Sequence, residues 1–257
     1  MQQIQTSPAN RPILRVAGAA AALCALVVLV LAASAPGKGA DVIGDLGGKA
    51  PPSCPTAKDP AAKPEKSCQV QATVTGFQMV GNGKRAAMKV PQDGKIVAWS
   101  VDLSEPSASE QNSFTATFDL GSPTARIAVL KETGKSKFKL AKQGAKINLD
   151  PLLGTEPIIT LASPLRVKKG SVIAISTANW IPNLAHDGKL TATGDKWRAS
   201  RSRQKCGDDP KKTNEQNQED LLAGRPQKKV GTVRTYGCTY TSSRLLYRAF
   251  YVPDKGN

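Results

Sequence analysis

Aromatic and arginine side chains gather in the second half of the chain, and their chemistry suits a sugar or an anionic ligand. Trp180 closes an apolar run, and a second tryptophan begins the basic segment Trp197–Arg203. Tryptophans at strand ends can stack on sugar faces, while arginines bind carboxylate, sulfate or phosphate oxygens with paired hydrogen bonds. Packing in a core is the alternative role of each tryptophan. The candidate ligand-binding residues are Trp180, Trp197, Arg198, Arg201, Arg203, Tyr236 and Tyr240.

No arrangement typical of a catalytic centre stands out in the sequence. His186 is the only histidine, so a serine or cysteine nucleophile has almost no choice of a base. Segments 136–139 and 202–205 fit a Ser-x-x-Lys pattern, but the motifs that accompany it in β-lactam-binding enzymes are missing. We therefore expect no catalytic residue and no cofactor. A glycosidase could use any two of the 20 carboxylates, so a secreted glycan hydrolase stays open as the alternative to a non-enzymatic module.

The cysteines predict a disulfide-bonded protein without a metal site. Cys24 lies in an apolar segment, and the four later cysteines allow three pairings. An even number in an oxidising compartment indicates two disulfides. The sequence has no Cys-x-x-Cys pair, which excludes the usual zinc-ligand spacing. Nearness in sequence favours the pairs Cys54–Cys68 and Cys206–Cys238.

An uncharged apolar segment of 20 residues, 16–35, follows Arg11 and Arg15. At a rise of ~1.5 Å per residue it is long enough to cross a hydrocarbon core of ~30 Å, and it also resembles a signal peptide. Pro36 disfavours cleavage directly before it, so we expect an uncleaved membrane anchor, with a secreted protein as the alternative. The basic flank precedes the segment, which places the rest of the chain outside the cytoplasm.

The charge balance favours an anionic partner. The chain carries 36 Lys and Arg against 20 Asp and Glu, a net charge of +16. Residues 1–35 hold two arginines and no acid, which leaves 34 basic and 20 acidic residues, or +14, beyond them. Outside a cell, such a surface attracts acidic wall polymers, phospholipid head groups and uronic-acid glycans. We expect an envelope-associated binding or structural module for anionic or carbohydrate polymers, and no nucleic-acid partner.

Composition divides the chain into three parts. Residues 1–35 form the tail with its anchor or signal peptide. Residues 36–66 are rich in Pro, Gly and Ala and have almost no large apolar side chains, so we expect a disordered linker. Short runs of alternating polarity then fill 67–257, which predicts a single all-β domain, an antiparallel β-sandwich of jelly-roll type.

The predicted strands have one apolar and one polar face. A hairpin is expected over 164–176, with Lys168–Gly170 at its tip. The strand segments are 70–74, 97–103, 114–120, 125–130, 137–140, 158–161, 171–177 and 245–252.

One helix is expected inside a long polar loop. Thr213 and Gln216 match a capping box, Gly224 could take the left-handed position that ends a helix, and Pro226 blocks its continuation. The helix should run over 214–223, within the loop that the second disulfide closes.

Segments 90–100, 196–200, 236–240 and 244–247 resemble an uncharacterised family of predicted secreted or membrane-anchored actinobacterial β-rich proteins. The resemblance covers about residues 68–252. It implies export and a β fold, but no activity and no site residues.

Overall fold

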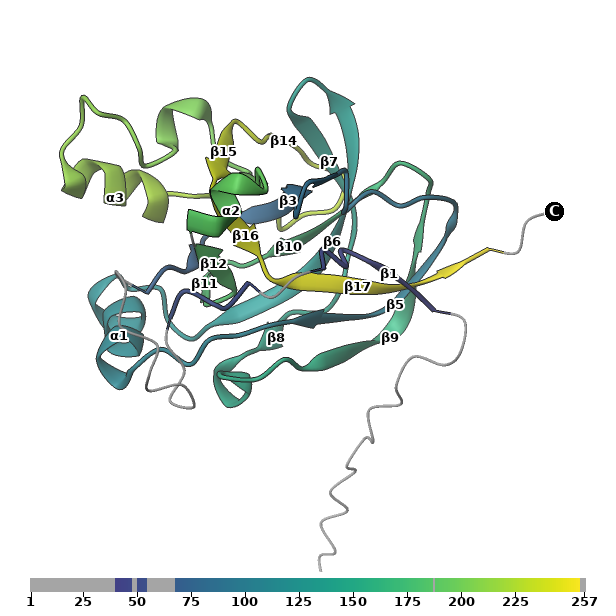
Figure 1. Ribbon diagram of the computed structural model, residues 1–257, viewed down its shortest axis with the longest axis horizontal. Coiled ribbons are helices and arrows are strands. Elements are labelled where there is room, and N and C mark those ends of the chain that lie inside the picture. The colour runs from purple at the N-terminus through teal and green to yellow at the C-terminus, as the bar shows by residue number, and fades with distance from the viewer. Residues whose placement is uncertain (1–39, 48–49, 55–67, 187, 255–257) are drawn as a thin grey trace, which may run out of the picture. The chain divides into compact units, whose positions relative to one another are not determined.

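A computed structural model describes residues 40–47, 50–54, 68–186 and 188–254, and the predicted anchor lies outside these ranges. Strands make up 42% of the described residues and helices 15%, so the prediction of a mainly β protein is confirmed. In the described ranges, no helix has the length and apolar character needed to cross a membrane. The strands are antiparallel, and most belong to two sheets (Figure 1).

The smaller sheet has the order β1-β17-β5-β9. Its first strand falls within the predicted linker, because Asp41–Ile43 pairs with the last strand of the chain. Ile43 and Leu46 are buried there, so a few apolar residues are enough to fix this part of the chain, and the expectation of a disordered segment is wrong at 41–46. The remaining linker residues 55–66 lie outside the described ranges. The strands are β1 (Asp41–Ile43), β17 (Tyr247–Pro253), β5 (Gly94–Val101) and β9 (Ile158–Val167).

The larger sheet follows the path β14-β7-β6-β10-β3-β13-β15 and is curled. Its two edge strands are consecutive in the chain, with only Tyr236 and Gly237 between them. Three residue steps span at most about 10 Å, so the two edges come close together at that end. The strands on this path are β14 (Val233–Thr235), β7 (Lys137–Gln143), β6 (Thr124–Gly134), β10 (Val172–Ser176), β3 (Thr75–Gly81), β13 (Lys196–Ala199) and β15 (Cys238–Thr241), with β4 (Lys84–Arg85) beside β3 and β8 (Ile147–Asn148) beside β6.

Both sheets contribute to one hydrophobic core. Ile96 and Trp99 of β5 belong to the same buried cluster as Ile127 of β6 and Ile173 of β10. Trp99 is 1% exposed and is thus a core residue. A β-bulge between Ile96 and Ala98 changes the side on which β5 residues are buried, so Val97 is only partly buried although its spacing predicts the inner face.

The predicted strand over 114–120 is wrong. The segment instead contains the end of a helix: α1 (Ala108–Asn112) is followed by a π-helical turn, Ser113–Thr117. A capping box begins α1, in which Glu110 N donates to Ser107 Oγ at 3.3 Å. Phe114 and Phe118 are four residues apart, a spacing that fits one side of a helix as well as one side of a strand. Phe114 packs against Trp180, and this contact favours the helical form.

Two further strand predictions need correction. The segments of the expected 164–176 hairpin belong to different sheets, since β9 pairs with β5 while β10 pairs with β6 and β3. The expected strand 70–74 is interrupted at Thr73, which has φ 49° and turns its hydroxyl to the carbonyls of Leu221 and Leu222, each at 3.2 Å. Before the break, β2 (Gln71–Ala72) pairs with β11 (Trp180–Ile181), and elsewhere β12 (Leu184–His186) pairs with β16 (Ser243–Leu245).

The predicted helix in the polar loop is confirmed as α3 (Asn214–Leu222). Gln216 N donates to Thr213 Oγ1 at 3.3 Å, and Thr213 N donates to Gln216 Oε1 at 3.0 Å. Gly224 does not adopt a left-handed conformation. A glycine is required there for a different reason, because a Cβ atom would lie 2.7 Å from the carbonyl oxygen of Thr73.

Both predicted disulfides, Cys54–Cys68 and Cys206–Cys238, are present. The second has a sequence separation of 32 residues and closes the loop that carries α3. Loop-closure entropy of that size corresponds to about 3–4 kcal/mol. Two shorter helical segments, α2 (Gly188–Ala192) and the 3₁₀ turn Arg203–Lys205, complete this part of the chain.

Candidate anion-binding site

The two candidate tryptophans are core residues. Trp180 is 1% exposed, its Nε1 donates to the carbonyl of Gly121 at 2.8 Å, and its ring lies 4.9 Å from that of Phe114. Trp197 is 4% exposed, and its Nε1 donates to Ser243 Oγ at 3.1 Å. Strand pairing turns both rings inward and buries them, and Trp197 also lines a pocket of about 780 Å³ together with Arg201 and Tyr240.

The candidate tyrosines also make internal contacts. Tyr236 is fully buried, and its hydroxyl donates to Gln227 Oε1 at 2.6 Å. Burial raises the pKa of the Tyr236 hydroxyl far above its usual value. Tyr240 is half-buried and stacks on Trp197, with ring centroids 4.5 Å apart. Its hydroxyl donates to the carbonyl of Cys206 at 3.0 Å, and burial raises its pKa.

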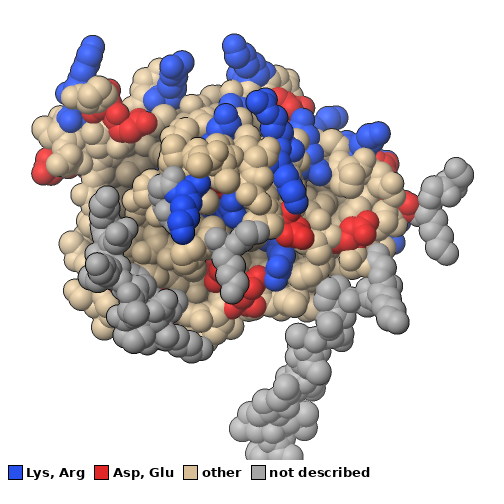
Figure 2. Space-filling view, in the orientation of Figure 1, with Lys and Arg blue, Asp and Glu red and all other residues tan. Residues whose placement is uncertain are grey.

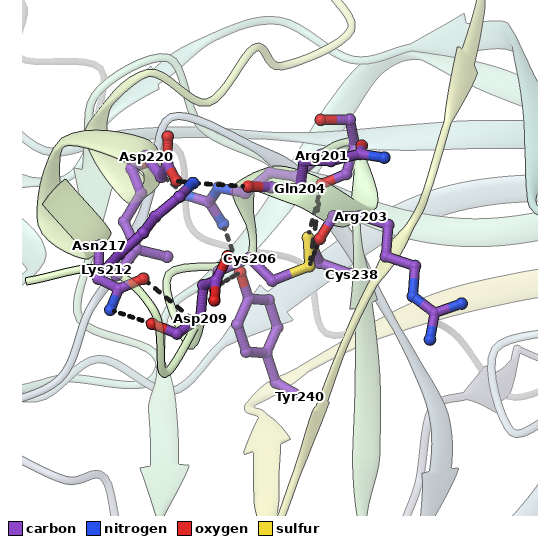
Figure 3. The surroundings of a disulfide bond; sticks show 12 residues. Arg201, Arg203, Gln204, Cys206, Asp209, Lys212, Asn217, Asp220, Cys238 and Tyr240 are labelled. Atoms are coloured by element: carbon purple, nitrogen blue, oxygen red, sulfur yellow. Dashed lines mark hydrogen bonds and ion pairs between the residues drawn. A yellow bond between two sulfur atoms is a disulfide. The ribbon is translucent and has the colours of Figure 1, made fainter.

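Arg201 holds the α3 loop against the rest of the domain. Its side chain is buried, Nη2 donates to the carbonyls of Ala72 at 2.8 Å and Leu221 at 2.6 Å, and Nη1 donates to Tyr240 Oη at 3.2 Å. Figure 3 shows Arg201 and Tyr240 beside the Cys206–Cys238 disulfide. Desolvation lowers the pKa of the Arg201 guanidinium. The guanidinium N–H groups of Arg201 donate to carbonyls of α3 and β2, so Arg201 has a structural role.

The two remaining arginines point to different places. Arg203 is exposed in its 3₁₀ turn beside the disulfide. Arg198 is half-buried on β13, and its Nη1 donates to Ser136 Oγ, at the β6–β7 turn, at 3.3 Å. The structure thus brings Trp197, Arg201 and Tyr240 together as a packed unit and places Arg198 at a separate site. Only Arg198 and Arg203 of the seven candidates keep a basic group near solvent.

Arg198 lines a pocket of about 290 Å³ in the curled sheet. Apolar and basic residues together make up most of its lining. Among the described residues, Glu132 is the only acid in the lining, against four basic residues. Among the described residues, none of the four basic side chains forms an ion pair. The apolar lining residues are Phe77, Met79, Val80, Ala86, Met88, Phe138 and Val172, and the basic ones are Arg85, Lys89, Lys196 and Arg198.

The outer face of the β6–β7 hairpin is strongly basic. Lys131 of β6 lies directly opposite Lys139 of β7, and both side chains are exposed. Phe138 and Leu140 are buried, so the lysines between and beside them point outward. Figure 2 shows Lys and Arg side chains over the upper part of the molecule, where β7 and β14 lie in Figure 1. The outer lysine face, as we call it, consists of Lys131, Lys137, Lys139, Lys142, Lys228 and Lys229.

This face was missed in the sequence, although a signal for it exists. Lys137 and Lys139 alternate with Phe138 and Leu140, a pattern that predicts one basic and one apolar face on a strand. The register that sets Lys131 against Lys139 cannot be derived from such alternation, because it depends on a β-bulge between this pair and the hairpin turn.

A separate cleft of about 640 Å³ contains two carboxylates, Asp102 and Glu156. Glu156 forms an ion pair with Arg248, whose Nη2 lies 2.6 Å from its Oε1. Asp102 is half-buried, and desolvation, followed by repulsion from Glu156, raises its pKa above the ordinary value. The described residues contain no group of three or more His, Cys, Asp or Glu that could hold a metal ion.

Comparison with known proteins adds no relative to this picture. The chain matches no family model, no curated protein sequence and no solved structure.

Proposed function

We propose that this protein is a non-enzymatic, envelope-associated module that binds anionic polymers, including acidic glycans, through its outer lysine face. Residues 16–35 would hold it at the cell membrane with the β domain outside, or be removed to release it. The two disulfides support an extracytoplasmic location, because such bonds persist in oxidising compartments. The core shared by two sheets supports a jelly-roll-like sandwich as the finer description of the fold, in line with the resemblance to secreted actinobacterial proteins.

The observation that carries the proposal is the pairing of Lys131 with Lys139. Like charges directly opposite each other on a sheet destabilise it. No Asp or Glu in the described part of the chain forms an ion pair with either lysine. A bound polyanion would offset this repulsion between Lys131 and Lys139. The outer lysine face is therefore more stable with an anionic ligand bound than when it faces water alone.

The test is retention of the full-length protein on polygalacturonate, with neutral dextran as the comparison. We expect retention on polygalacturonate alone, weakening as salt rises, and no new reducing ends. Lys139→Glu should weaken binding by about fivefold, since an exposed ionic contact contributes up to about 1 kcal/mol. Lys211→Glu, an equal charge change at an exposed site in the α3 loop, is the matched control. Equal losses in the two variants would show that only net charge matters and would refute the assigned face.

A second candidate function, glycan hydrolysis, is supported by the Asp102–Glu156 cleft. A carboxyl with a raised pKa beside an ionised carboxylate can act as a general acid. Under this alternative, polygalacturonate incubated with the protein releases reducing ends, and Asp102→Asn abolishes the release. Retention without turnover supports the binding module instead.

A further inference from the structure

We propose that the pocket in the curled sheet binds a small amphiphilic anion, a medium-chain carboxylate, with its chain inside and its charged group at the rim. This site is distinct from the outer lysine face, since the β6–β7 hairpin turns Lys131 and Lys139 outward and Phe138 inward. The proposal therefore does not depend on polymer binding.

Two aromatic rings that line the pocket pack against each other and against a third ring. The rings of Phe77 and Phe138 line the pocket and lie 5.1 Å apart. Tyr236, on the two-residue link between the edge strands, packs on both rings, with centroid distances of 5.7 Å to Phe77 and 5.0 Å to Phe138. Phe77 and Phe138 therefore give the pocket an aromatic wall.

The lining favours an apolar body over a sugar. Met88, Phe138 and Val172 line the pocket, and methionine side chains adapt to ligands of different shape. In the described part of the chain, Gln78 has the only uncharged polar side chain that lines the pocket. Its Nε2 donates to Val80 O at 2.8 Å and its Oε1 accepts from Leu245 N at 2.9 Å, so it already has partners. Sugar hydroxyls would find few hydrogen-bond partners here.

The rim selects the charge of the ligand. Four cations surround the opening against the single carboxylate of Glu132. Nε of Arg198 is buried and has no hydrogen-bond partner within the described ranges. Arg85 and Lys89 are exposed and free to move toward a bound carboxylate. An anionic head group at the rim would offset the repulsion among these four side chains.

The volume of the pocket limits the length of the ligand. About 290 Å³ holds roughly ten water molecules at ~30 Å³ each. A ligand of about ten non-hydrogen atoms fills that space, which matches a carboxylate with an eight-carbon chain.

The experiment is calorimetric titration of the full-length protein with octanoate, acetate and octan-1-ol. Acetate keeps the charge without the chain, and octan-1-ol keeps the chain without the charge. We expect octanoate to bind at least about tenfold more tightly than either. The double variant Arg85→Ala, Lys89→Ala should weaken octanoate binding at least about fivefold, because it removes two exposed rim charges.

The matched control is Lys131→Ala, Lys139→Ala, which removes the same charge from the outer face and should leave octanoate affinity unchanged. Met79→Trp, which adds volume to the partly buried interior, should abolish binding while thermal unfolding shows a folded protein. Equal binding of octan-1-ol and octanoate, or equal losses in the two double variants, would overturn the proposal. Retention on polygalacturonate would be unaffected by that result, so the two proposals fail separately.

Discussion

The loop around the Cys206–Cys238 disulfide and the β6–β7 hairpin are both rich in basic residues, but those residues have opposite surroundings. In the loop, the Arg201 guanidinium is buried and donates to Ala72 O, Leu221 O and Tyr240 Oη. On the hairpin, Lys131 and Lys139 are exposed and face each other without an acid between them.

The difference shows that the role of a basic residue depends on its hydrogen-bond and ion-pair partners and not on its residue type. A cation with partners inside the protein stabilises the fold, whereas one without them can bind a ligand. Arginines and aromatic residues close together are the usual sign of a glycan or anion site, and here most of them hold the fold together. Lys131 and Lys139 belong to no recognisable motif in the sequence, yet neither forms an ion pair within the described part of the structure. The comparison can be tested at both regions.

The largest effect is expected for Arg201→Met. It removes the donors of Ala72 O and Leu221 O and leaves both carbonyls without that partner. Each hydrogen bond to a charged group contributes about 1.5–3 kcal/mol, so the free energy of unfolding should fall by about 3–5 kcal/mol. Urea unfolding measures the loss. Polygalacturonate retention of the folded variant should match the wild type.

Arg203→Ala is the control for this prediction, because Arg203 is exposed in the same loop. It should change stability by less than about 0.5 kcal/mol. A stable Arg201→Met variant that no longer binds polymer would reverse the comparison and make Arg201 a binding residue.

A smaller effect of the opposite sign is expected for Asp102→Asn. The folded protein raises the pKa of Asp102 above its ordinary value of 3.8, mainly by desolvation, so ionisation costs stability in the fold. The wild type therefore loses stability as pH rises through the folded pKa, and asparagine removes this loss. At pH 7 the variant should have a free energy of unfolding higher than the wild type by up to about 1 kcal/mol, since Asp102 is partly solvated and solvent screens its charge. Below the unfolded pKa the two proteins should be equally stable.

Thermal unfolding at pH 3 and pH 7 checks this sign. The same substitution at an exposed carboxylate, Asp254→Asn, is the control. A gain that is equal at both pH values would show that burial of the Asp102 charge is not its cause.

The smallest change in stability is expected on the β6–β7 hairpin. Lys139→Glu sets a carboxylate opposite Lys131 and should stabilise the protein by about 0.2–1 kcal/mol, because an opposite-charge pair replaces a like-charge pair. The same variant is expected to bind polygalacturonate less tightly, so stability and binding change in opposite directions. Lys139→Ala should lie between the two in both measurements. A destabilised Lys139→Glu would mean that the lysine pair is not repulsive in the folded protein.

Local signals in the sequence predicted local structure well. The segments 125–130, 137–140, 158–161 and 171–177 fall largely within β6, β7, β9 and β10. Alternation with a period of two residues is seen in β7 and in the first half of β9, where one face is more buried than the other, whereas β10 is buried on both faces and was marked by its apolar run. The capping box at Thr213 placed the start of α3 correctly, because its two hydrogen bonds lie within four residues of chain. Both disulfide pairings could also be predicted from short separations.

The errors occurred where distant contacts override a local pattern. The helical form of 113–117 depends on Trp180, and the break at Thr73 depends on the carbonyls at the end of α3. Two of the candidate ligand-binding residues are buried for the same reason. Trp197 and Arg201 have side chains suited to ligand binding. In the fold, however, Trp197 donates its hydrogen bond to Ser243 and Arg201 donates to the carbonyl of Leu221 in the α3 loop.

The sequence by itself therefore determined the properties that depend on composition and short spacing: a basic chain, mainly β, with two disulfides and one capped helix. Only the tertiary structure decided which basic groups lack partners, because exposure, strand register and the curl of a sheet arise from contacts between residues far apart in the chain. The opposition of Lys131 and Lys139 and the pocket below Arg198 are both of this kind. Neither exists in any single stretch of sequence, since each requires several strands to be paired first.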